Sequence, residues 1–126
     1  MNQRTAVRND AASALSRAHL RPSLLLLLAE APSHGYELLE QVRALGVRLA
    51  DPTGLYRALR SMDEDGLVVS WWERSQSGPD RRRYVITDAG REALEAFVAE
   101  LRDARGMLDA VLDRYDQHSH SVRRRS

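Results

Sequence analysis

The chain has 126 residues, a net charge of +1, 43% hydrophobic and 29% charged residues, and no cysteine. These values are typical of one soluble globular domain with a modest core, and the missing cysteine excludes disulfides and thiolate metal sites. No apolar run approaches the length of a membrane span, so we expect a cytoplasmic protein. The sequence has no metal-ligand spacing, no Gly-rich phosphate loop and no catalytic constellation, which predicts neither a cofactor nor an enzyme.

Charge is unevenly distributed along the chain. Residues 1–22 contain four Arg and one acid (+3), residues 92–116 three Arg and seven acids (−4), and residues 117–126 three Arg and no acid (+3). Such segregation suggests that one part of the protein meets an anionic partner. All 19 basic residues are arginine, a side chain suited to bidentate contacts with phosphate and guanine.

The first half of the chain predicts three helices after a polar N-terminal segment. We expect residues 1–20 to form a flexible basic arm, and Pro22 suits the first turn of a helix that continues through residues 24–30. Ser33 is a candidate cap for a second helix over about residues 34–45. Its predicted core-facing set is Tyr36, Leu38, Leu39, Val42 and Leu45.

The third helix has the clearest boundaries in the sequence. Asp51 is a favourable N-cap, Pro52 fits the first helical position, and Gly66 follows a predicted end near Asp65. The apolar side chains recur at helical spacing and predict a buried face, made of Leu55, Ala58, Leu59 and Met62.

Two strands and a long helix complete the chain. Residues 67–74 and 81–87 flank a Gly-Pro turn and predict a hairpin. A last helix starts at Thr87 or Asp88 and runs to about Asp116, and residues 117–126 are expected to be a disordered basic tail. The predicted fold class is therefore α+β, mostly α: a winged helix-turn-helix domain over residues 21–88, followed by a dimerisation helix over residues 89–116.

If the apolar face of the third helix is buried, a polar stripe faces outward. The stripe consists of Thr53, Tyr56, Arg57 and Arg60, and Gly54 leaves space for a phosphate near the helix start. These groups suit contacts with DNA phosphates and guanine edges. The alternative is an ordinary solvated face on which Arg60 pairs with Glu64.

The hairpin adds further candidate DNA contacts and two tryptophans. Alternation places Arg81 and Arg83 on one face of their strand and Arg82 on the other, and all three arginines are candidates for phosphate contacts. Alternation places Trp72 on one face of the first strand, with Ser70 and Val68, and Trp71 on the other. For Trp71 the sequence leaves three roles open: covering the wing beneath Arg81 or Arg83, packing against a second subunit, or lining an effector pocket.

The last helix carries an unbroken apolar stripe with spacings of 4, 3, 4, 3 and 4. Its residues are Phe97, Leu101, Ala104, Leu108, Val111 and Tyr115. Beyond about residue 100 no domain core is left to cover this stripe, so we expect a homodimer. A helix folded back on its own domain is the alternative.

Three blocks, HGYELLEQV, DPTGLYRALRSMDEDGLVVSWWE and SGPDRRRYVITDAGREAL, resemble the PadR family of bacterial transcriptional regulators over about residues 21–95. The resemblance implies a winged-helix repressor that dimerises through its C-terminal helix and is released from operator DNA by a small molecule. It also implies that Tyr56 is the tyrosine of the DNA-recognition helix. Because the family carries an aromatic residue at the position of Trp72, the resemblance further implies that Trp72 packs into the core and that Trp71 lies on the outer face. One departure is Gly54, which stands where the family usually has threonine, so Thr53 would have to supply that hydroxyl.

Together the residues and the resemblance predict a dimeric, sequence-specific DNA-binding regulator. Its expected partners are double-stranded operator DNA, a second copy of the chain and a small hydrophobic or aromatic effector, with Trp71 and Trp72 as candidate effector contacts. The rival hypothesis is a dimeric winged-helix module that binds protein through its wing without specific DNA binding.

Overall fold

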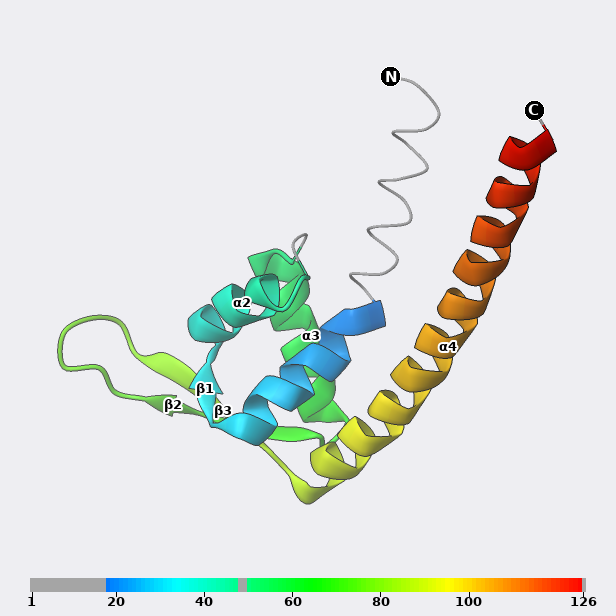
Figure 1. Cartoon of the computed structure of the whole chain (residues 1–126). Coiled ribbons are helices and arrows are strands. Elements are labelled where there is room, and N and C mark those ends of the chain that lie inside the picture. The colour runs from blue at the N-terminus through cyan, green and yellow to red at the C-terminus, as the bar shows by residue number, and fades with distance from the viewer. Residues whose placement is uncertain (1–17, 48–49, 126) are drawn as a thin grey trace. The chain divides into compact units, whose positions relative to one another are not determined.

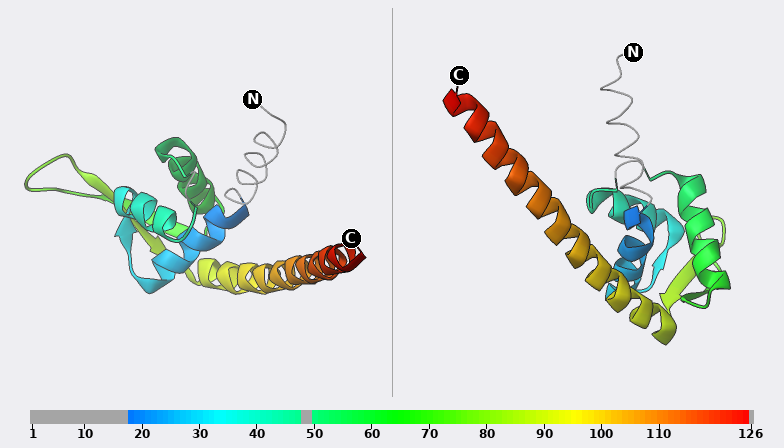
Figure 2. Two further views of the ribbon diagram at one scale, coloured as in Figure 1. Left: turned by 45° about the horizontal axis from the view of Figure 1, so that its top comes forward. Right: turned by 90° about the vertical axis from the view of Figure 1, so that its right-hand side faces the viewer.

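The structure is a computed structural model that describes residues 18–47 and 50–125. The chain divides after Leu94 into two compact units. In the described part, the first unit contains three helices, a small antiparallel sheet and the start of a fourth helix, and the second contains the rest of that helix. Figures 1 and 2 show these elements. Most of the predicted N-terminal arm, residues 1–17, lies outside the described residues.

The first helix covers residues 18–30 of the described chain. Residue 18 is already helical, so the prediction that Pro22 lies in the first turn is wrong. The terminal nitrogen Nη2 of Arg21 donates to Oγ of Ser61 and forms a 3.0 Å ion pair with Asp65, which ties this early turn to the third helix. Leu24, Leu25 and Leu28 are buried and form one side of the core.

Helix α2 (Gly35–Ala44) contributes Leu38, Leu39 and Val42 to the core. Its N-cap is His34, which makes no capping hydrogen bond, so the expectation that Ser33 caps this helix is wrong. Tyr36, predicted to be a core residue, is 66% exposed, because its position two residues before Leu38 turns it to the opposite side of the helix. Leu45 follows the helix as its C-cap and is also exposed.

Helix α3 (Pro52–Glu64) has the boundaries that the sequence predicts. Asp51 is its N-cap, and Oδ1 of Asp51 accepts a 2.7 Å hydrogen bond from the backbone N–H of Gly54. Its inner face is fully buried in the core, since Leu55, Leu59 and Met62 have no exposed surface. The helix is thereby fixed along one face, and the opposite face is left for other contacts.

The sheet has three strands, β1 (Ser33–His34), β2 (Val68–Glu73) and β3 (Arg81–Ile86), in the antiparallel order β1-β3-β2. The sequence predicted β2 and β3 but not β1, which has only two residues and therefore no periodic signal. We use "wing" for β2, β3 and the loop between them. Figure 1 shows the loop extending away from the helices.

The predicted alternation along the wing is confirmed. The register pairs Val68 with Ile86 and Ser70 with Tyr84, and Val68, Ile86 and Tyr84 are buried against the helices. Toward the loop, the same face continues with Trp72 opposite Arg82. Burial decreases at this end of the face, where Trp72 is exposed and Arg82 is half-buried.

A short, hydrogen-bonded junction around Thr87 connects the wing to helix α4 (Asp88–Arg125). The Thr87 hydroxyl donates to the carbonyl of Gly66 at 2.6 Å and accepts from the N–H of Gly90 at 3.0 Å, and the N–H of Thr87 donates to the carbonyl of Leu67. Gly90 itself is buried at this point. The helix start is therefore fixed by hydrogen bonds to the turn between α3 and β2.

Helix α4 continues to Arg125, so the predicted end near Asp116 and the predicted disorder of residues 117–125 are wrong. After Gly106 the sequence has no glycine or proline that would end the helix. In its last turn, the positive charges of Arg123, Arg124 and Arg125 interact favourably with the negative end of the helix dipole. Among the described residues, none of the helices combines the length and the hydropathy that crossing a bilayer requires.

Candidate nucleic-acid interface

The outward face of α3 presents the predicted polar stripe. Thr53, Tyr56, Arg57 and Arg60 are all exposed, whereas the residues between them are buried or half-buried. Nε of Arg60 lies 3.4 Å from Glu64, but with 84% of the Arg60 side chain exposed such a surface pair contributes little. Arg57 makes no ion pair within the described part of the chain. Both guanidinium groups are thus available to an anionic partner.

The Tyr56 ring packs against a glycine at the start of α2. A Cβ atom added to Gly35 would lie 2.5 Å from Cε1 and 2.9 Å from the hydroxyl of Tyr56. The tyrosine ring therefore lies directly on the backbone at the start of α2, in space that any other residue at position 35 would occupy. The absence of a side chain at Gly35 thus leaves the space that a residue of the α3 stripe occupies.

The three wing arginines have different surroundings. Arg81 is exposed and makes no ion pair among the residues that the structure covers. Arg82 is half-buried, and its Nε donates to Oγ of Ser70 at 2.9 Å. Nε of Arg83 lies 3.5 Å from a Glu73 carboxylate oxygen. Arg81 is therefore the freest of the three for an external phosphate.

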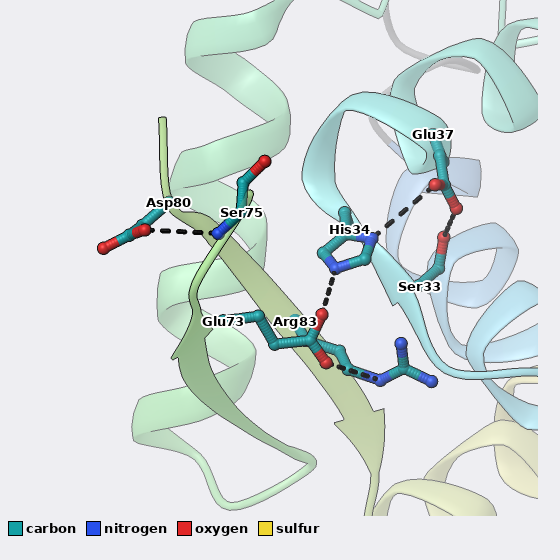
Figure 3. A network of polar contacts seen from close by, with 7 residues as sticks. All are labelled: Ser33, His34, Glu37, Glu73, Ser75, Asp80 and Arg83. Atoms are coloured by element: carbon teal, nitrogen blue, oxygen red, sulfur yellow. Dashed lines mark hydrogen bonds and ion pairs between the residues drawn. The ribbon is translucent and has the colours of Figure 1, made fainter. Parts of the chain in front are cut away.

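A chain of polar contacts connects α2 to the wing (Figure 3). Nε2 of His34 lies 2.9 Å from Oε2 of Glu73, and the other carboxylate oxygen of Glu73 faces Arg83. On the other side of the imidazole ring, Nδ1 of His34 lies 3.6 Å from a carboxylate oxygen of Glu37. The hydrogen bond to the Glu73 carboxylate requires a proton on Nε2 of the histidine. Sequence reasoning placed His34 in the first turn of α2 and missed this link, since β1 gave no signal.

Ser70 is a second residue that sequence reasoning missed. Its hydroxyl donates to a carboxylate oxygen of Asp63 at 2.6 Å and accepts from Arg82. The contact connects the end of α3 to both strands of the wing. The sequence did contain a signal for this role, because Ser70 is a polar residue among apolar strand residues and lies on the same face as Val68.

Of the two tryptophans, Trp72 differs from the prediction and Trp71 agrees with it. Trp72, expected in the core, lies toward the loop end of β2 and is 64% exposed. A cation–π contact is present at this residue, where the guanidinium carbon of Arg82 lies 5.4 Å from the centroid of a Trp72 ring. This is a different pair from the contact of Trp71 with Arg81 or Arg83 that the sequence left open. Trp71 lies on the outer face opposite Arg83 and is 45% exposed.

A cavity of about 390 Å³ opens between the start of α2, α3 and the wing. Its lining includes four aromatic side chains, Tyr36, Tyr56, Trp72 and Tyr84. Burial is the main reason that the pKa of Tyr84 is raised, and a hydrogen bond to the Glu40 carboxylate raises the pKa of Tyr36. Both tyrosines are therefore neutral hydrogen-bonding groups at physiological pH.

Helix α4 exposes its apolar side chains in the second unit. Leu108, Val111 and Tyr115 are 57–68% exposed, and Met107 and Leu112 beside them are also exposed. Of the other residues of the predicted stripe, Phe97 and Leu101 are half-buried and Ala104 is exposed. The predicted roles of the stripe in dimerisation, and of Trp71 and Trp72 in effector binding, stay predictions.

A three-helix domain with a β-wing, whose third helix exposes a polar and basic face, defines the winged helix-turn-helix class. The Transcriptional regulator PadR-like family matches residues 24–96, more than half of the chain, and the chain belongs to this family. It is thus a member of a family of transcriptional regulators and not of enzymes, as the sequence predicts, and the fold class is confirmed.

Individual relatives agree with this assignment. The chain is 34% identical over 80 residues to "Probable transcriptional regulator Rv1176c" of Mycobacterium tuberculosis, in a match that covers 62% of this chain and 42% of the relative. It therefore spans less than half of that relative's length. The PadR-like regulator BC4206 of Bacillus cereus has a TM-score of 0.66 at 26% identity, covering 75% of this chain and 91% of that structure.

A third similar structure is that of Bacillus subtilis PadR in complex with operator DNA. It has a TM-score of 0.57 and 18% identity, and the match covers 63% of this chain and 46% of that one. At 18% identity, the similarity to this structure is evidence for a shared fold alone.

Proposed function

We propose that the chain is a dimeric transcriptional repressor that binds operator DNA through α3 and the wing and is released by a small molecule. The observation that carries this proposal is the outward stripe of α3. One face of the helix is completely buried, and the other presents Tyr56, Arg57 and Arg60 to solvent next to an arginine-bearing wing. Docking a helix of this kind in the major groove is the standard geometry of helix-turn-helix proteins.

The wing fits a positioning role on the DNA backbone. Arg81 is exposed and unpaired within the described chain, while Arg82 and Arg83 are oriented by Ser70 and Glu73. Phosphate contacts fix the register of a protein on the duplex but do not distinguish sequences. Sequence preference then comes from the α3 arginines. The structure of Bacillus subtilis PadR with operator DNA supports this assignment by likeness of fold.

Repression predicts a direct effect on transcription. Adding the purified protein to an in vitro transcription reaction from a promoter fragment that it retains should reduce the transcript, because the bound dimer occludes the polymerase. A fragment without affinity for the protein is the control. An increased transcript from the retained fragment would instead make the protein an activator and contradict the repressor assignment.

The dimer is proposed from the exposed apolar side chains of α4. A stripe of this length favours a second copy as its cover, and a two-fold dimer would present two α3 helices to one palindromic site.

Leu108→Glu is expected to raise the dimer dissociation constant by about a hundredfold or more, since each copy loses a buried leucine worth about 1.5–3 kcal/mol. Sedimentation equilibrium measures this change. Gln117→Glu adds the same charge on the opposite side of α4 and should leave the dimer intact. A wild-type chain that sediments as a monomer at all concentrations would refute the dimer.

A further inference from the structure

His34 lies between two carboxylates that belong to different elements (Figure 3). Nε2 of its imidazole ring faces Glu73 at the end of β2, and Nδ1 faces Glu37 in the first turn of α2. The His34 side chain is only 13% exposed, and its Nδ1 is buried without a hydrogen-bond partner in the described part of the chain. Buried polar atoms without a partner are rare in folded proteins, because each of them costs free energy. The unpaired nitrogen therefore indicates that this site is better suited to a protonated ring than to a neutral one.

The charges in contact with one another around the ring balance only when His34 is protonated. Glu37 and Glu73 contribute two negative charges, and Arg83 of β3, which lies 3.5 Å from the second Glu73 oxygen, contributes one positive charge. With a neutral imidazole this cluster has a net charge of −1, and with an imidazolium it has none. In an imidazolium both ring nitrogens are donors, so the protonated ring can bind both carboxylates at once.

The other elements near the ring add no charged contact to it. From α3, the Tyr56 ring lies on Gly35, the residue that follows His34. The tyrosines around this place are uncharged near neutral pH. Three charged wing residues line a cavity to which His34 also contributes, and among the described residues none of the three pairs with the imidazole: Asp80, Arg81 and Arg82.

The contact between His34 and Glu73 connects the start of α2 to both strands of the wing. His34 belongs to β1, and the strand order β1-β3-β2 places β3 between β1 and the strand that carries Glu73. The contact therefore crosses β3, where Arg83 is the register partner of His34. Glu73 is the last residue of β2 before the wing loop, so the contact holds the loop end of the wing against α2.

We propose that His34 is a proton-sensitive positioning residue of the wing: its protonated ring binds Glu37 and Glu73 together and thereby fixes the wing arginines relative to α3. Histidine changes its charge between about pH 5 and about pH 8. The stabilisation is present when the ring is protonated, at the acidic end of this range, and is lost as the pH rises and Nδ1 releases its proton. Protonation also cancels the negative charge of the cluster, so both effects favour an anionic duplex at lower pH. The regulatory part of this inference rests on the proposed function.

Nitrogen NMR of the DNA-free protein tests the proton site. The chain has four histidines, and the ring signals that His34→Gln removes belong to His34. At about pH 5.5 these signals should show protons on both ring nitrogens, and at about pH 8 they should show a proton on Nε2 alone. A histidine buried in its neutral form would instead keep a single proton down to about pH 5, and that result would overturn the proposal.

Thermal unfolding tests whether the proton holds the wing. The Tm of the wild type should exceed that of Glu37→Gln by at least about 4 °C more at about pH 5.5 than at about pH 8, because a neutral amide is a weaker partner for an imidazolium than a carboxylate is. Glu40→Gln is the matched control, since it removes the same charge from α2 at a residue that does not face His34, and its Tm difference should be the same at both pH values. A difference for Glu37→Gln that does not change with pH would refute the bridge.

Duplex binding as a function of pH decides the regulatory part. The affinity of the wild type for a retained duplex, relative to that of His34→Gln, should rise about fivefold or more from about pH 8 to about pH 5.5. His120→Gln removes an exposed histidine of α4 and should keep the pH dependence of the wild type. An unchanged ratio for His34→Gln would refute the regulation and leave the proposed DNA-binding function intact. If no duplex binds at all, the proposed function fails, whereas the NMR and unfolding results still decide the proton site.

Discussion

Gly90→Ala is expected to destabilise the first unit by about 3 kcal/mol and to lower its Tm by at least about 10 °C. A Cβ atom at this position would lie 2.1 Å from the carbonyl oxygen of Leu67 and 2.7 Å from Cγ1 of Ile86. The closest atom belongs to the backbone, so the start of α4 must move away from the sheet. That movement breaks the hydrogen bonds of Thr87 with Gly66 and Gly90. Thermal unfolding followed by circular dichroism measures the shift.

Gly106→Ala is the matched control in the same helix. A Cβ atom at Gly106 meets nothing within 4 Å, and alanine favours a helix over glycine by about 1 kcal/mol, so this variant should be as stable as the wild type or more stable. Both variants are compared at one protein concentration, because dimerisation would make Tm depend on concentration. An unchanged Tm for Gly90→Ala would show that the junction is not packed as described.

Arg57→Ala and Arg60→Ala are each expected to reduce the discrimination between operator and mutated operator by about tenfold to a hundredfold. The reason is that a guanidinium contact with a base edge is worth about 1–3 kcal/mol of discrimination. Fluorescence anisotropy with a panel of duplexes, each changed at one base pair, measures this loss. The effect should be concentrated at one or two positions of the site, which identifies the base pairs that each arginine contacts.

Arg81→Ala provides the comparison. This arginine lies on the wing and is expected to contact phosphate, so its removal should weaken binding equally for all duplexes and reduce the salt dependence by about one phosphate contact. If Arg81→Ala changed the sequence preference while Arg57→Ala and Arg60→Ala left it unchanged, the proposed roles of α3 and the wing would be reversed.

The sequence predicted α3 well because three independent signals agreed there. Asp51 and Pro52 mark its start, Gly66 follows its end, and the apolar residues between recur with the helical period. The alternation of the wing was equally clear, because a period of two separates the faces of a strand without further information.

Other features of the structure depend on where the neighbouring helices and strands end. The periodicity of the sequence does not encode these end points. Trp72 has the alternation of a core residue but lies toward the loop end of β2 and is exposed, and Tyr36 lies in an amphipathic helix but on its exposed side. The link from His34 to Glu73 needs β1, a strand too short to recognise. The cavity beside Tyr56 depends on Gly35, whose role becomes visible only when the two helices are placed together.

The most direct test of the proposed function is duplex binding as a function of salt. Genomic fragments, beginning with the region upstream of the protein's own gene, are first selected by retention on the protein. The affinity for a retained fragment is then measured over a range of salt concentrations. We predict that log K falls linearly with log salt, with a slope of about −0.9 for each phosphate contacted. Failure to retain any duplex at low salt, or an affinity that does not change with salt, would contradict the assignment of α3 and the wing to DNA.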